Sequence, residues 1–202
     1  MSDEYQRWQT RFSAPGYLFG KEPNDFLKSK ASLLKHGQKA LSIADGEGRN
    51  GVFLAEQGLD VLAIDFSPVA LEKSRALAKE RGVALRTELA DVATWTWPVA
   101  EFDVVVAIFF QFCGPELRSR IFASIKRALK PGGRLLLEGY RPKQLEYKTG
   151  GPSQVENLYT RELLETEFKD FSSIAIDEYD KVISEGAGHG GMSALIDLVG
   201  RK

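Results

Sequence analysis

The sequence predicts an open, doubly wound α/β fold built on a largely parallel sheet. Apolar strands alternate with helical segments over residues 39–138, which is the pattern of successive βαβ units. The run 102–109 is almost continuously apolar, as expected of a strand covered on both faces of a sheet. A glycine-rich turn at 45–51 joins the first of these strands to the helix that follows it.

The expected elements follow in order along the chain. Ser67 suits a helix N-cap and Pro68 the first helical turn, and Thr160 suits a second N-cap. Two extended segments near the C-terminus are joined by a glycine-rich stretch, which predicts a hairpin and a last strand antiparallel to the others. The predicted strands are 39–44, 59–64, 83–88, 102–109, 134–138, 172–183 and 191–199. The predicted helices are about 49–57, 68–81, 115–128 and 160–168.

The first 20 residues are rich in aromatic side chains, namely Tyr5, Trp8, Phe12, Tyr17 and Phe19. Two interpretations stay open: an arm packed on the core, or a flap whose rings wall a ligand site and exclude water. Pro23 suits the first turn of a following helix. We expect one domain over 1–202, in which 1–36 is an arm and helix capping the site and 37–202 is the α/β core.

Composition limits the function classes. The chain has 202 residues, a formal net charge of −1 and no block of basic residues, which argues against a dedicated nucleic-acid surface. Cys113 is the only cysteine, so the chain forms no internal disulfide. The apolar run 104–110 is too short to span a bilayer, and the first residues lack a signal-peptide pattern. We therefore expect a cytoplasmic protein that does not bind membranes.

The turn contains Gly46, Gly48 and Gly51, a G-x-G-x-x-G spacing that predicts a nucleotide-like ligand. Asp45 precedes the first glycine and Asp65 ends the second strand. A carboxylate after the second strand suits a ribose diol, whichever nucleoside carries it.

Asp45 and Asp91 separate the possible ligands. A carboxylate immediately before the first glycine would repel a pyrophosphate, whereas it suits an ammonium or a sulfonium. Asp91, after the third predicted strand, suits an exocyclic amine. Three acidic strand ends favour a cationic nucleoside over a dinucleotide.

These residues resemble the class I S-adenosylmethionine-dependent methyltransferases. The resemblance covers about 17–199 and rests on Asp45-Gly46-Glu47-Gly48-Arg49-Asn50, Asp65, Ala90-Asp91-Val92, Pro131-Gly132-Gly133 and the terminal hairpin. The stretch 17–24 and the exit Glu138-Gly139-Tyr140 look like the tellurite-resistance and thiopurine-type branch. The resemblance implies a Rossmann-like, seven-stranded mixed sheet of order 3-2-1-4-5-7-6.

The resemblance also implies S-adenosylmethionine as the cofactor. In it, Gly46 and Gly48 would pack on the methionine part, Asp65 would hold the ribose, and Asp91 with the Val92 amide would bind adenine. One residue departs from the family pattern: Glu47 stands where an apolar, small or cysteine residue is commoner, and we expect it to point away from the ligand. The full set of predicted cofactor-binding residues is Asp45, Gly46, Gly48, Asp65, Phe66, Asp91, Val92, Ile108 and Tyr17.

The methyl acceptor is expected to be a small molecule. The stretch Ile108-Phe109-Phe110-Gln111 occupies the place of the Asn/Asp-Pro-Pro-Tyr element of amino-group methyltransferases. Its aromatic character suits an apolar acceptor or a soft sulfur, selenium or tellurium nucleophile, which needs no general base. No catalytic residue stands out; His189, Tyr140 and Glu138 are weak candidates for contact with the acceptor, each with a structural alternative. We expect no metal, and a plain buried thiol at Cys113.

Two other functions stay open. A module that binds S-adenosylmethionine without turnover is compatible with the same residues. An NAD-dependent oxidoreductase also uses G-x-G-x-x-G, but Asp45 and the absence of a Tyr-x-x-x-Lys pair count against it. The sequence predicts no oligomeric state.

Overall fold

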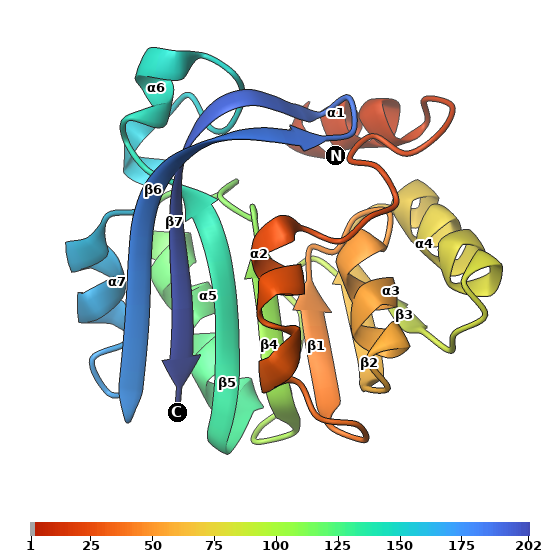
Figure 1. Ribbon diagram of the computed structural model, residues 1–202, viewed down its shortest axis with the longest axis horizontal. Helices are drawn as coiled ribbons and strands as arrows, with labels where there is room; N and C mark the ends of the chain where they lie inside the picture. The colour runs from red at the N-terminus through yellow and green to blue at the C-terminus, as the bar shows by residue number, and fades with distance from the viewer. Residues whose placement is uncertain (1–2) are drawn as a thin grey trace. The chain divides into compact units, whose positions relative to one another are not determined.

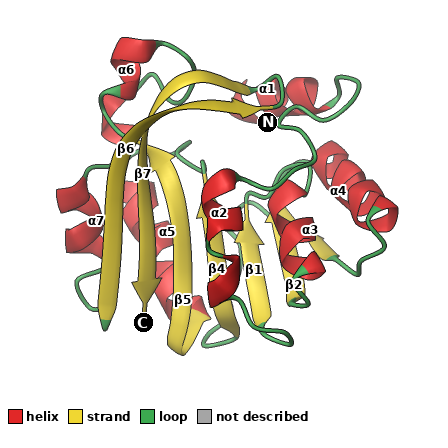
Figure 2. Cartoon of the chain, in the orientation of Figure 1, coloured by secondary structure: helices red, strands yellow, loops and turns green. Residues whose placement is uncertain are grey.

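The computed structural model describes residues 3–202, so the prediction about the first residues lies partly outside the described chain. By its internal contacts the chain divides into two compact units, 1–95 with 185–188, and 96–184 with 189–202. Within the described residues, seven strands form one sheet of order β3-β2-β1-β4-β5-β7-β6, which confirms the predicted fold class (Figures 1 and 2).

The first unit carries three parallel strands, β1, β2 and β3. Buried apolar side chains of β1 and β2 form its centre, and α3 and α4 pack against these strands. Ser67 accepts a hydrogen bond from the Ala70 amide and Pro68 opens α4, as the sequence predicts. The elements are α1 (Asp3–Phe12), α2 (Asp25–Ser29), η1 (Ala31–Leu33), β1 (Lys39–Ile43), α3 (Arg49–Glu56), β2 (Asp60–Asp65), α4 (Pro68–Glu80) and β3 (Arg86–Leu89).

The second unit is built on a parallel pair, β4 and β5, with β7 antiparallel to β5. This confirms the antiparallel last strand. Thr160 accepts a hydrogen bond from the Leu163 amide and caps α7, again as predicted. The elements are β4 (Phe102–Ile108), α5 (Pro115–Ala128), β5 (Leu129–Tyr140), α6 (Gln144–Tyr147), η2 (Val155–Asn157), α7 (Arg161–Glu167), β6 (Ser173–Glu185) and β7 (His189–Arg201).

Some predicted boundaries were wrong. The N-terminal aromatic segment contains a helix, α1, which the sequence does not predict. Pro23 lies before α2 rather than in its first turn, because the Asn24 side chain accepts from the Leu27 amide and is the N-cap. β5 begins at Leu129 and is irregular, since its register against β4 shifts between Phe102 and Val104.

Candidate functional site

The glycine turn of the first unit is organised by the carboxylate of Asp45. Its Oδ1 accepts from the Ser42 hydroxyl at 2.5 Å, and both oxygens accept from the Gly51 amide at 3.1 and 3.2 Å. Ala44, just before it, has a φ of 48°, a strained value for a residue with a side chain. Asp45 therefore joins the end of β1 to the start of α3, and the chain stores strain at this turn.

Asp65 meets the same turn from β2. Its Oδ2 accepts from the Gly46 amide at 2.9 Å and its Oδ1 from the Ser67 amide at 2.9 Å. Both Asp45 and Asp65 are buried, with 8% and 3% of their surface exposed. The structure thus brings together two of the three predicted acidic strand ends.

Burial changes the acidity of both groups. Loss of hydration raises the pKa of Asp45 to about 7 and that of Asp65 to about 6, while their hydrogen bonds act in the opposite direction. The proximity of Asp65 raises the pKa of Asp45 further. Two desolvated carboxylates at one turn favour a cationic ligand and disfavour a phosphate.

Two glycines of the turn are required by close approaches. Gly48 has a φ of +93°, and a Cβ there would lie 2.3 Å from Ser74 Oγ and 2.7 Å from Ser74 Cα on α4. A Cβ at Gly51 would lie 2.5 Å from Asp45 Oδ2. Gly48 therefore allows α4 to approach the turn, and Gly51 makes room for the carboxylate that caps α3.

The remaining predicted residues of this unit lie around the turn in different ways. Asp91 is exposed and its Oδ1 accepts from the Ala93 amide at 2.9 Å, whereas Val92 is buried. The Phe66 ring lies 5.6 Å from the Tyr5 ring. The Tyr17 hydroxyl donates to the Lys73 carbonyl oxygen at 3.1 Å, so this end of its side chain is turned to α4.

In the second unit, three rings gather where β4 and β5 end. The Phe109 ring stacks on Tyr140 at 4.7 Å, and the His189 ring meets Phe109 edge-on at 4.6 Å. Phe109 has a φ of 52°, which is rare for a bulky residue and is typical of functional positions. Tyr140 and His189 are thus brought together, and Ile108, which precedes Phe109, is buried.

Glu138 contacts Tyr179 through its side chain. It is 2% exposed, and the Tyr179 hydroxyl donates to its Oε1 at 3.3 Å and to Asp197 Oδ2 at 3.0 Å. Burial, followed by the nearby Glu138 and Asp197 charges, raises the pKa of Tyr179. Near the C-terminal end of β5, Glu138 is therefore bonded to Tyr179 of β6, which also bonds Asp197 of β7.

Sequence reasoning missed Gln111, which positions Tyr140. Its amide Nε2 donates to the Tyr140 carbonyl oxygen at 2.9 Å, and its Oε1 accepts from the Tyr140 amide at 2.6 Å. The Gln111 side chain therefore bonds the backbone of Tyr140 as the backbone of a neighbouring strand would. No periodicity or spacing in the sequence indicates this pairing.

Two further residues of these segments have structural contacts. Arg49, at the start of α3, pairs with Glu185 at 2.8 Å. Cys113 is buried, and loss of hydration raises the pKa of its thiol to about 11, which fits a plain structural thiol.

Within residues 3–202, no cluster of three or more His, Cys, Asp or Glu side chains is arranged to hold a metal ion. No helix in this part of the chain is long and apolar enough to cross a membrane.

The raised pKa of Asp45 predicts a pH-dependent stability. The folded state binds this proton more tightly than the unfolded state, whose aspartate has the usual pKa of 3.8. The contribution of Asp45 to stability is therefore full below about pH 4 and is lost as the pH rises through about 7. Asp45→Asn keeps an acceptor for the Gly51 amide and does not ionise. We expect the free energy of unfolding of Asp45→Asn, measured in urea between about pH 4.5 and about pH 8, to increase relative to that of the wild type as the pH rises. A difference between the two proteins that does not change with pH would contradict this.

Residues 40–133 match the model of a protein family described as a methyltransferase domain. That stretch contains Asp45, the glycine turn, Asp65 and Asp91, and it lies in a sheet of order 3-2-1-4-5-7-6. This part of the chain is therefore similar to a methyltransferase domain, and its sheet order is the one that the resemblance to class I S-adenosylmethionine-dependent methyltransferases implies.

Two curated relatives and one solved structure illustrate the similarity. Over 129 residues the chain is 32% identical to ribosomal protein L11 methyltransferase of Thermus thermophilus, covering 62% of this chain and 49% of the relative. Over 163 residues it is 26% identical to 2-heptyl-1-hydroxyquinolin-4(1H)-one methyltransferase of Mycobacteroides abscessus, covering 76% of this chain and 71% of the relative. The chain thus spans about half the length of the first relative.

The solved structure is phosphoethanolamine N-methyltransferase 2 of Haemonchus contortus, in complex with phosphomonomethylethanolamine and S-adenosylhomocysteine. It superposes with a TM-score of 0.71 at 19% identity, covering 98% of this chain and 58% of that chain. At this identity the likeness concerns the fold.

Proposed function

We propose that this protein transfers a methyl group from S-adenosylmethionine to a small molecule that reacts through a soft nucleophile such as sulfur, selenium or tellurium. The observation that carries the proposal is the pair of buried carboxylates, Asp45 and Asp65, on the glycine turn. Their negative charge suits a ligand that bears a sulfonium and an ammonium. When bound, S-adenosylmethionine supplies the activated methyl group.

The residues of the first unit fit the cofactor by their chemistry. Asp65 has two carboxylate oxygens at the end of β2, where a ribose diol is expected. Asp91 and the Val92 amide follow β3 and would bind the adenine. Gly46, Gly48 and Asp45 would face the methionine part, with Phe66 and Tyr17 as further predicted contacts.

The residues of the second unit support an apolar or aromatic acceptor. Phe109, Tyr140 and His189 form a cluster of rings at the ends of β4 and β5, in place of the polar element of amino-group methyltransferases. Glu138 is engaged with Tyr179, so the acidic candidate is committed to a structural contact. A soft nucleophile needs orientation and exclusion of water more than it needs a general base.

The known relatives fit this proposal unequally. The Mycobacteroides abscessus enzyme acts on a flat heteroaromatic small molecule, and the match spans most of both chains. The Thermus enzyme methylates a ribosomal protein, but the match spans only half of it. We therefore favour a small-molecule acceptor, in the cytoplasm and within the tellurite-resistance and thiopurine-type branch, without a nucleic-acid or membrane partner.

A panel of acceptors tests the reaction. Purified protein is incubated with S-adenosylmethionine and aromatic thiols, thiopurines, selenite or tellurite, with amines and phenols as a comparison. We expect S-adenosylhomocysteine to form with at least one soft acceptor and little of it with amines. Turnover on amines alone would overturn the acceptor class. Cofactor binding with silence across broad panels would instead favour a sensor module, and nicotinamide binding would favour an oxidoreductase.

A further inference from the structure

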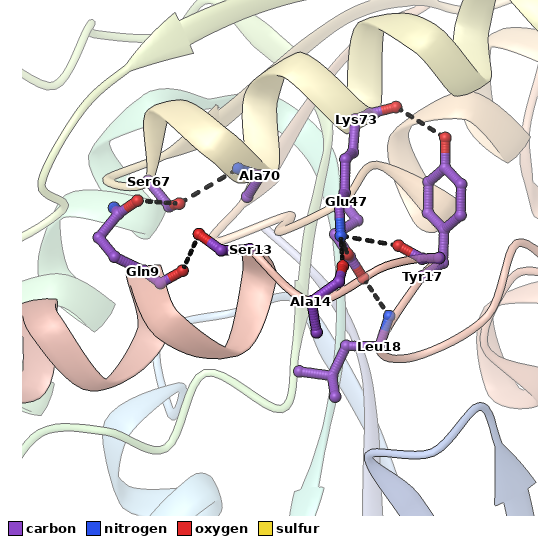
Figure 3. Close-up of polar contacts among 10 residues, drawn as sticks. Gln9, Ser13, Ala14, Tyr17, Leu18, Glu47, Ser67, Ala70 and Lys73 are labelled. Carbon is purple, nitrogen blue, oxygen red and sulfur yellow. Dashed lines mark hydrogen bonds and ion pairs between the residues drawn. The ribbon is translucent and has the colours of Figure 1, made fainter.

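Glu47, which departs from the family pattern, is directed at the N-terminal segment. It stands between Gly46 and Gly48 and is 4% exposed. Its Oε2 accepts from the Leu18 amide at 2.6 Å, and its Oε1 pairs with Lys73 Nζ at 2.8 Å (Figure 3). The glycine turn is thereby bonded directly to a segment about 30 residues earlier in the chain.

Lys73 of α4 holds the same segment at two further points. Its ammonium donates to the Ala14 carbonyl oxygen at 2.8 Å and to the Gly16 carbonyl oxygen at 2.7 Å. Tyr17, which stands between Gly16 and Leu18 in the sequence, donates from its hydroxyl to the Lys73 carbonyl oxygen. Figure 3 shows these bonds converging on Lys73 and Glu47. We call Glu47, Lys73 and the segment 14–18 the clamp.

The clamp follows directly on a helix that covers the turn. Phe12, the last residue of α1, is buried, and its Cζ lies 3.4 Å from the position of a Cβ on Gly46. The Trp8 ring stacks on Phe12 at 5.3 Å. Gln9 of the same helix accepts from the Ser67 hydroxyl at the start of α4 at 3.1 Å. The clamp therefore fixes the C-terminal end of a cover that lies on the first glycine of the turn.

A contribution to folding stability does not by itself explain the ion pair between Glu47 and Lys73. Removing a carboxylate and an ammonium from water costs free energy, and well-packed apolar residues are often at least as stabilising. The side chain of Glu47 is 3% exposed and that of Lys73 is 21% exposed. Because the Lys73 side chain is partly exposed, water is able to replace its partners. The Glu47–Lys73 pair is therefore suited to a contact that opens and closes.

We propose that Glu47 and Lys73 are positioning residues that hold the segment 14–18 closed beside the cofactor turn and so slow the exchange of S-adenosylmethionine and S-adenosylhomocysteine. The proposal rests on the cofactor site proposed above. A ligand that leaves the turn past Gly46 must displace Phe12, and the clamp bonds limit that displacement. The rate of cofactor release is then set in part by the opening of the clamp.

The test measures release directly in the full-length protein. Tritiated S-adenosylhomocysteine is bound and then chased with unlabelled S-adenosylhomocysteine, and retained label is followed with time. Lys73→Met removes the charge and keeps the length of the side chain. We expect its release rate to rise about tenfold or more, the scale of lost hydrogen bonds to a charged group. Lys73→Arg should restore slow release.

Two further variants separate positioning from general loss of stability. Lys130→Met removes a lysine that pairs with Asp103 at 2.8 Å in the second unit, and its release rate should equal that of the wild type. Glu47→Gln keeps an acceptor for the Leu18 amide and should also speed release. Combining Glu47→Gln with Lys73→Met should add little to the effect of Lys73→Met alone, because Lys73→Met already removes the ion pair with Glu47.

The outcomes distinguish this proposal from the one before it. Unchanged release in both Lys73→Met and Glu47→Gln would overturn the clamp and leave the cofactor site intact. Equal acceleration in Lys130→Met would overturn it as well, since the effect would then be nonspecific. Failure of the wild type to bind S-adenosylhomocysteine would overturn the proposed cofactor site instead.

Discussion

Asp65→Ala is expected to weaken binding of S-adenosylhomocysteine by about tenfold to a hundredfold, since a hydrogen bond to a charged group contributes about 1.5–3 kcal/mol. Asp65 holds the Gly46 and Ser67 amides at 2.9 Å each. The substitution therefore removes the proposed ribose acceptor and also leaves two buried donors of the turn without their carboxylate. Isothermal titration calorimetry gives the affinity.

The matched control uses the other end of the same strand. Asp60 begins β2, is exposed and pairs with Arg86 at 3.0 Å. Asp60→Ala should bind S-adenosylhomocysteine like the wild type. If Asp65→Ala binds equally well while remaining folded, the ribose lies elsewhere and the cofactor site is wrongly placed.

The largest expected loss of stability follows from Gly48→Ala. The new Cβ would be forced into a left-handed backbone conformation, at a cost of about 1–3 kcal/mol. It would also lie 2.7 Å from the Cα of Ser74, and overpacking of this kind costs about 1–3 kcal/mol more. We expect the free energy of unfolding to fall by about 3 kcal/mol or more in urea titrations.

Gly82→Ala isolates the backbone part of this effect. Gly82 also has a positive φ, +69°, but a Cβ there meets no atom within 4 Å. Its loss of stability should be the smaller of the two, limited to conformational strain. If the two variants lose the same amount, α4 does not approach the turn as closely as the structure shows.

Much of the fold follows from local sequence signals. Ser67 with Pro68 and Thr160 mark helix starts that the structure confirms, because capping depends on neighbours in the sequence. The apolar run of β4 and the glycine-rich hairpin connection are local in the same sense. The sequence does not predict α1, because its aromatic residues obscure a weaker helix signal, the basic Arg11 in its last turn.

The contacts within the site were harder to predict. Sequence spacing placed Asp45 and Asp65 at one edge, but not the bonds of Asp45 to Ser42 and Gly51. The sequence suggests only that Glu47 points away from the ligand. It does not indicate the partners of Glu47, because these lie 26 and 29 residues away along the chain. Likewise the pairing of Gln111 with the backbone of Tyr140 depends on tertiary structure alone.

The central claim, that the acidic glycine turn and the ends of β2 and β3 bind S-adenosylmethionine, is tested most directly by a crystal structure of the protein with S-adenosylhomocysteine. We predict that the Asp65 carboxylate accepts hydrogen bonds from the ribose hydroxyls and that the adenine lies against Asp91 and Val92. A ligand bound away from β1 and β2, with Asp65 still bonded only to Gly46 and Ser67, would contradict the claim.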